Sequence, residues 1–80
     1  MGRWPRKRSE RLGGKLLAIR QSLGITQSEM ANRLDYAVHK RLSEFESGKR
    51  EPKLLVLLRY AKVANVSVES LIDDEIELKF

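Results

Sequence analysis

Residues 26–52 contain two short amphipathic segments in close succession, and this pair constrains the fold more than any other part of the sequence. Thr26 can cap a helix N-terminus, and Glu29, three residues later, can accept a hydrogen bond from the Thr26 backbone N–H to complete a capping box. Apolar residues then share one face at helical spacing: Met30, Ala31 and Leu34. The pattern predicts a short helix that begins at Gln27 and buries this face.

The second segment predicts a helix over residues 37–47, after a connection too short for a structured loop. Its inward face is formed by Val38, Leu42 and Phe45, at positions i, i+4 and i+7. Its outward face carries His39, Lys40, Ser43 and Glu44. Gly48 is suited to a left-handed cap, and Pro52 to the first turn of the next helix. Two short helices joined by a tight turn are how small proteins present one helix to the major groove of DNA.

Two runs of residues in and next to these segments resemble a known family. Gly-Ile-Thr-Gln-Ser-Glu-Met-Ala at 24–31 and Leu-Ser-Glu-Phe-Glu-Ser-Gly-Lys-Arg-Glu-Pro at 42–52 resemble the Cro/phage-repressor type (XRE family) of helix-turn-helix regulators. The sequence departs from the commonest family spacing by one extra residue before Leu42, and Asp35 stands where a small residue or glycine is usual. The resemblance implies an all-α fold, a compact five-helix bundle of the lambda-repressor-like type, and covers most of the chain.

The flanking segments fit the same bundle. The first helix, over residues 10–23, is expected to be capped by Ser9, with Glu10 in its first turn and with Leu12, Leu16, Ile19 and Leu23 inward. Gly13 and Gly14 each cost roughly 1 kcal/mol relative to Ala, which predicts fraying before Lys15. The fourth helix is expected to bury Leu54, Leu57, Leu58, Ala61 and Ala64 and to end at Asn65. Ser67 then caps a short fifth helix with Val68, Leu71 and Ile72 inward.

The helical region, residues 9–72, lies between two segments of different character. Residues 1–8 form a basic arm with Arg6, Lys7 and Arg8, which either tracks DNA phosphates or is a solvated tail. Residues 73–80 are acidic with alternating apolar residues. They fit a short strand that pairs across a dimer axis or packs on the last helix, and also a disordered acidic end. Other candidates for an exposed dimer patch are Leu55, Val56 and Val63.

Composition narrows the classes of function. A length of 80 residues favours one small domain. A net charge of +5 favours a polyanionic partner. It has one histidine and no cysteine, so neither a paired-histidine metal site nor a catalytic triad can be assembled, and no phosphate-binding glycine loop is present. Glu44 and Glu46 point to different sides of a helix, unlike a catalytic pair. We therefore expect no enzyme activity, no metal and no cofactor. Without a membrane span or a secretion signal, a cytoplasmic protein is expected.

The outward face and the resemblance together assign the site residues. Base contacts are expected from the side chains of His39, Lys40, Ser43 and Glu44. Phosphate contacts are expected from Gln27, Arg41, Ser47, Lys49 and Arg50, and from Arg6, Lys7 and Arg8 of the arm. For His39 the alternative is an imidazole that faces water, and for Arg41 a solvated charge. In the resembled proteins an arginine of the first helix pairs with the glutamate before the Ser/Asn-Gly cap, which implies a pair between Arg20 and Glu46 here.

Two hypotheses of function remain open at this point. The first is a sequence-specific DNA-binding transcriptional regulator, repressor-like, that places residues 37–47 in the major groove and binds a palindromic operator on double-stranded DNA as a homodimer. The second is an antitoxin-like or coactivator-like module that uses the same fold mainly to bind a protein partner. The sequence feature that favours the second is the segment at residues 76–80.

Overall fold

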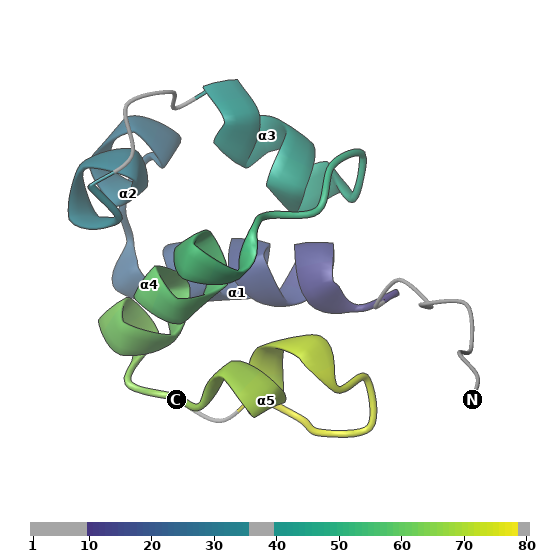
Figure 1. Ribbon diagram of the computed structural model, residues 1–80. Coiled ribbons are helices and arrows are strands. Elements are labelled where there is room, and N and C mark those ends of the chain that lie inside the picture. The colour runs from purple at the N-terminus through teal and green to yellow at the C-terminus, as the bar shows by residue number, and fades with distance from the viewer. Residues whose placement is uncertain (1–9, 36–39, 79–80) are drawn as a thin grey trace.

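The computed structural model describes residues 10–35 and 40–78, which form five α-helices. In chain order these are α1 (Leu12–Leu23), α2 (Gln27–Arg33), α3 (Lys40–Ser47), α4 (Leu54–Ala64) and α5 (Val68–Ile72). Helix α1 crosses the middle of the molecule, with α2 and α3 on one side of it and α5 on the other (Figure 1). The all-α, five-helix prediction is confirmed for the described residues.

The ends of the helices follow local sequence signals. The predicted capping box at the start of α2 is present: the Glu29 backbone N–H donates to Thr26 Oγ1 over 3.1 Å, and the Thr26 N–H donates to Glu29 Oε1 over 2.8 Å. At α5, the Ser70 N–H donates to Ser67 Oγ over 3.1 Å. Helices α1 and α4 end on left-handed residues, Gly24 (φ 67°) and Asn65 (φ 59°), whose N–H groups bond back to carbonyls of the last turn. Ser9, the expected cap of α1, lies outside the described residues.

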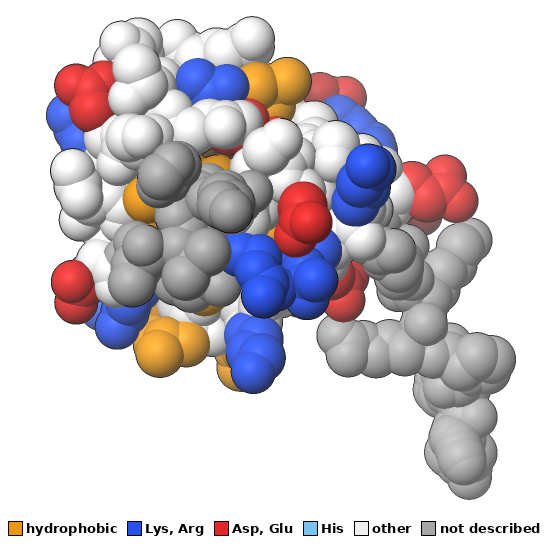
Figure 2. Space-filling model, turned by 90° about the horizontal axis from the view of Figure 1, so that it is seen from above, with side chains coloured by type: hydrophobic (Ala, Val, Ile, Leu, Met, Phe, Trp, Pro, Cys, Tyr) orange, Lys and Arg blue, Asp and Glu red, His pale blue; other side chains and the backbone are white. Residues whose placement is uncertain are grey.

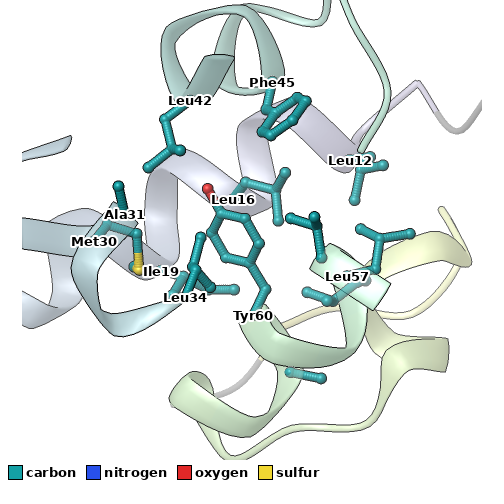
Figure 3. Close-up of a cluster of buried hydrophobic side chains, with 13 residues drawn as sticks. Leu12, Leu16, Ile19, Met30, Ala31, Leu34, Leu42, Phe45, Leu57 and Tyr60 are labelled. Atoms are coloured by element: carbon teal, nitrogen blue, oxygen red, sulfur yellow. The ribbon is translucent and has the colours of Figure 1, made fainter. Parts of the chain in front are cut away.

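One hydrophobic core joins all five helices (Figure 3). Leu16 and Ile19 of α1, Met30 of α2, Leu42 of α3 and Tyr60 of α4 are completely buried in it. Leu71 anchors α5 to the same core. Because residues from every helix meet at one centre, the position of α3 is fixed by the rest of the bundle.

The buried face of α4 differs from the predicted one. Val56 and Tyr60 are buried together with Leu57 and Ala61, whereas Leu54 is 71% exposed and Leu58 39% exposed. Several faces of this segment carry large apolar residues, so the periodicity of the sequence alone does not determine which face is buried. The buried face is determined by the fit of the Tyr60 ring into the core. The same rotation makes Val56 wrong as a surface dimer contact, and Val63 packs partly against the core, while Leu55 is exposed. Leu23 and Ile72, also expected inward, are partly exposed.

Helix α1 is continuous from Leu12 through Lys15, where fraying was predicted, and it begins at Leu12 rather than at residue 10, so Glu10 precedes its first turn. Gly13 lies where α1 closely approaches the end of α3. A Cβ atom at this position would sit 2.9 Å from the carbonyl oxygens of Phe45 and Glu46. Gly14 has open space around the same position. A glycine destabilises a helix interior, but at Gly13 the absence of a side chain allows the backbones of α1 and α3 to approach closely.

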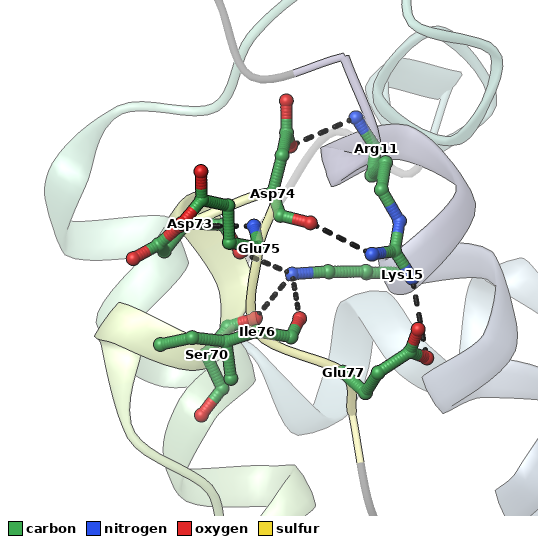
Figure 4. Close-up of polar contacts among 8 residues, drawn as sticks. All are labelled: Arg11, Lys15, Ser70, Asp73, Asp74, Glu75, Ile76 and Glu77. Carbon is green, nitrogen blue, oxygen red and sulfur yellow. Dashed lines mark hydrogen bonds and ion pairs between the residues drawn. The ribbon is translucent and has the colours of Figure 1, made fainter.

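The C-terminal segment, residues 73–78, folds back against the start of α1 and forms no strand (Figure 4). The Lys15 ammonium is buried and donates to three carbonyl oxygens, those of Ser70, Asp73 and Ile76, at 2.6–2.8 Å. The Asp74 carboxylate accepts the backbone N–H groups of Glu10 and Arg11. Residues 73–78 therefore do not form the predicted strand in the described chain, because their carbonyls satisfy a lysine that sits among the inward residues of α1. Pairing of the tail across a dimer axis stays a prediction.

The two adjacent glycines provide a matched test of the approach between α1 and α3. We expect Gly13→Ala to lower the free energy of unfolding by about 1–3 kcal/mol, because the added methyl group meets backbone oxygens. Gly14→Ala should raise it by up to about 1 kcal/mol, because an alanine in a helix interior restricts the unfolded chain without a clash. Urea unfolding of both variants measures the difference. Equal effects of the two substitutions would contradict the close approach.

The Asp74 contact predicts a pH dependence. The two backbone N–H donors, Glu10 first and then Arg11, hold the pKa of Asp74 below its usual value. A depressed folded-state pKa stabilises the protein above the unfolded-state pKa of about 3.9, and this contribution disappears as the pH falls through the folded-state value. Wild type should therefore exceed Asp74→Ala in stability at pH 7, and their unfolding curves should converge in strong acid. A difference in stability between wild type and Asp74→Ala that stays constant down to pH 2 would contradict a stabilising role of the ionised Asp74 carboxylate.

Candidate nucleic-acid interface

The outward face of α3 is oriented by the two residues that anchor the helix. Leu42 and Phe45 are buried in the core, so Ser43, between them in sequence, is exposed on the opposite side. Glu44 follows on the same side and is partly exposed. His39 and the inward residue Val38 lie outside the described residues, and Lys40 begins α3 with a side chain that is not described. Ser43 and Glu44 are thus the predicted base-contacting residues that the structure places on the outer face.

The loop after α3 is attached to Glu44. The backbone N–H groups of Lys49 and Arg50 both donate to the Glu44 carbonyl oxygen, at 2.9 and 3.2 Å, and Ser47 Oγ donates to the same oxygen over 3.2 Å. Gly48 makes this turn at φ 83°. Arg50 Nε lies 2.9 Å from Glu44 Oε1 in an ion pair that is about half exposed on both sides. The loop therefore holds its cations beside the outer face of α3.

Glu46 points the other way, into the junction between α1, α2 and α3. Its carboxylate accepts Arg20 Nε over 2.7 Å and Arg20 Nη2 over 3.1 Å. Gln27 Nε2 donates to the same carboxylate over 3.0 Å. The hydrogen bond to Glu46 raises the pKa of Arg20 above its ordinary value, against the opposing effect of burial. The side chain of Glu46 is only 5% exposed and that of Arg20 19%, so this is a largely buried pair.

The pair implied by the family resemblance is thus present, and it also involves Gln27. Gln27 was assigned to phosphate, but its amide nitrogen is directed to Glu46 in this structure. A glutamine at the first helical position of α2 therefore links α2 to the end of α3. Any phosphate contact by Gln27 has to form alongside this bond or replace it.

Basic side chains line a hollow between α3, the loop and the start of α4, which has a volume of ≈ 210 Å³. It is lined by Arg41, Phe45, Arg50, Glu51, Lys53 and Val56. The view from above shows Lys and Arg side chains gathered near the middle of the face that α2 and α3 form, with acidic groups among them (Figure 2). Lys53 was not among the predicted site residues, although a lysine directly after Pro52 is a visible signal. Arg6, Lys7 and Arg8 of the arm lie outside the described residues.

Other kinds of site find no support in the described part of the chain. Within residues 10–35 and 40–78, no group of three or more His, Cys, Asp or Glu side chains is arranged to hold a metal ion. In the same ranges, no helix is both long and apolar enough to cross a membrane.

A family model described as helix-turn-helix, HTH_3, matches residues 16–71. The chain belongs to the Cro/C1-type helix-turn-helix family. The match begins within α1 and ends within α5, so it contains α2, α3 and the loop with Lys49 and Arg50. A comparison with curated proteins finds no match.

Solved structures of a repressor and of DNA-binding domains have the same fold. The N-terminal DNA-binding domain of SinR from Bacillus subtilis is 28% identical, with a TM-score of 0.73 over 84% of this chain and 97% of that one. The P22 c2 repressor bound to a synthetic operator is 24% identical, with a TM-score of 0.72 over 79% of this chain and 94% of that one. The solution structure of the P22 c2 repressor DNA-binding domain, 20% identical, has a TM-score of 0.72 over 92% of this chain and 96% of that one.

The buried pair predicts a large stability effect that an exposed pair does not show. We expect Glu46→Ala to lower the free energy of unfolding by about 3 kcal/mol or more, because it leaves the partly buried Arg20 charge without its partner. Glu44→Ala is the matched control on the same helix, and losing its exposed pair with Arg50 should cost less than about 1 kcal/mol. Thermal melts of both variants measure the two effects. A Glu46→Ala melt that overlaps wild type would disprove the structural role of the pair.

Proposed function

We propose that the protein is a sequence-specific DNA-binding regulator of transcription that inserts the outer face of α3 into the major groove. The observation that carries the proposal is the geometry of α3: Leu42 and Phe45 fix its inner side in the core, which leaves Ser43 and Glu44 exposed beside a basic loop. Membership of the helix-turn-helix family supports it. So do the similar solved structures, among them a repressor in complex with a synthetic operator.

Two kinds of contact are assigned to different parts of this surface. His39, Lys40, Ser43 and Glu44 meet base edges, where a lysine suits guanine O6 and N7 and a glutamate accepts from cytosine N4. Lys49 and Arg50 of the loop contact phosphates, with Arg41, Ser47 and the arm residues Arg6, Lys7 and Arg8 in the same role. To these we add Lys53, which lines the cationic hollow beside Arg50. A homodimer on a palindromic operator and action as a repressor belong to the same proposal.

The alternative, a module that mainly binds another protein, loses its main support in the described structure. The described part of the C-terminal segment that favoured it is bound to the start of α1 through Asp74, and through Lys15 up to Ile76. Among the described residues, α4 still exposes the apolar side chains of Leu54, Leu55 and Leu58, which could serve such a contact. DNA binding is therefore the function that the site supports best.

Selection of bound sites from random duplex DNA, followed by titration at several salt concentrations, tests the proposal. We expect enrichment of a palindromic site and a linear fall of log K with log salt, because each neutralised phosphate releases counterions. A scrambled duplex of the same length is the control. Binding that is equally tight for the scrambled duplex, or no enriched site, would contradict sequence-specific recognition.

Glu44 and Lys49 should affect binding in different ways. Glu44→Ala should relax the preference at one base pair of each half-site, a loss of about 1–3 kcal/mol of discrimination. Lys49→Ala should weaken binding to every sequence and reduce the salt slope by about 1, because one phosphate contact is removed. Parallel titrations against the selected and the scrambled duplex measure both effects. If the two variants lose affinity uniformly and alike, the outer face of α3 is only an electrostatic surface.

A further inference from the structure

The turn after α2 is held by an arginine from a different helix. Arg59 of α4 directs Nη1 to two consecutive carbonyl oxygens, that of Leu34 over 2.9 Å and that of Asp35 over 3.2 Å. These carbonyls stand at the C-terminal end of α2, where the helix itself supplies no partner for them. Arg59 thus supplies, from a different helix, the hydrogen-bond donor for carbonyl groups at the end of α2.

The same turn is conformationally unusual. Asp35 adopts the left-handed conformation, at φ 54°, without being a glycine. Aspartate tolerates this region better than most residues, but its backbone is still less stable there than that of glycine. A left-handed residue directs the chain out of α2, so its geometry sets the direction in which the connection to α3 departs. Surrounding contacts have to hold such a residue in place.

Helix α4 provides a rigid base for this contact. Tyr60, next to Arg59, is completely buried, and Leu57 and Ala61 of the same helix are buried with it. The far end of α3 is fixed separately, through Gly13 and the pair between Arg20 and Glu46. The near end of α3 follows the turn at Leu34 and Asp35 after four residues. Arg59 is therefore placed to hold the turn from which the chain runs to the start of α3.

We propose that Arg59 is a positioning residue for DNA recognition: its guanidinium clamps the left-handed turn after α2 and thereby sets the start of α3 against the base edges. The proposal rests on the proposed function and deepens it. Major-groove readout comes mainly from the N-terminal turns of a recognition helix, so an error at this end affects base contacts more than phosphate contacts. Arg59 acts here without touching DNA.

Two other roles of Arg59 give different results in binding experiments. As a phosphate contact, Arg59 would contribute equally to all sequences and to the salt slope. As a purely stabilising residue, it would change the melting temperature and leave the ratio of specific to non-specific affinity unchanged. The positioning role predicts a change in that ratio with an unchanged salt slope.

The test compares Arg59→Met, which removes both hydrogen bonds, with Arg59→Lys, which keeps the charge but not the planar donor group. Lys62→Met is the matched control, since it removes an exposed charge from the same helix. Each variant is titrated with the selected and the scrambled duplex at temperatures where its melt shows it to be folded. For Arg59→Met we expect the affinity ratio to fall by about tenfold, the size of losing one base contact, with the same salt slope as wild type. Arg59→Lys should fall between Arg59→Met and wild type, and Lys62→Met should match wild type.

An unchanged ratio in Arg59→Met would overturn the proposal, as would a uniform loss with a salt slope reduced by about 1 that Arg59→Lys restores. Hydrogen–deuterium exchange of the free protein gives a second readout that needs no DNA. The peptide spanning residues 34–40 should exchange faster in Arg59→Met than in wild type, and equal exchange would also overturn the clamp. If wild type itself selects no site, the proposed function fails, while the exchange measurement still decides whether Arg59 holds the turn.

Discussion

The attachment of α3 to α1 is the interaction on which the rest of the surface depends. At one point Gly13 lets the two backbones meet, and at another the Glu46 carboxylate is buried against Arg20 and Gln27. A carboxylate that is 5% exposed has to keep its partners, because a buried charge without them is strongly destabilising. With α3 held by both contacts, Ser43 and Glu44 face outward.

Helix α1 has a second function on another of its faces. Its buried lysine, Lys15, binds carbonyl oxygens at the end of α5 and beyond, and Asp74 binds the backbone N–H groups that precede the helix. Burial lowers the pKa of Lys15, and the three carbonyl oxygens supply hydrogen-bond partners for its buried ammonium group. One helix thus carries α3 on one side and closes the bundle on the other (Figure 1).

Local signals predicted most of the fold, and contacts between distant residues account for what was missed. The capping box of Thr26 and Glu29 and the cap at Ser67 depend on three or four neighbouring residues, so the sequence reveals them. The buried face of α4 depends on how Tyr60 fits a core built by four other helices, and five neighbouring apolar residues leave that choice open. The partners of Lys15 and Arg59 lie more than twenty residues away, so no local pattern pointed to either contact. In the interface, the orientation of Ser43 and Glu44 followed from helical period, whereas the pairing of Glu44 with Arg50 required the shape of the loop.

Backbone amide chemical shifts during titration with the selected duplex test most directly whether α3 is the DNA-reading element. If it is, the largest changes fall on residues 40–47 and on the loop at Lys49 and Arg50, and α5 with residues 73–78 changes little. The Lys15 contacts provide an internal reference, because they lie across α1 from the proposed surface. Changes centred on Leu54, Leu55 and the C-terminal segment, with α3 unaffected, would contradict the assignment of α3 to the major groove.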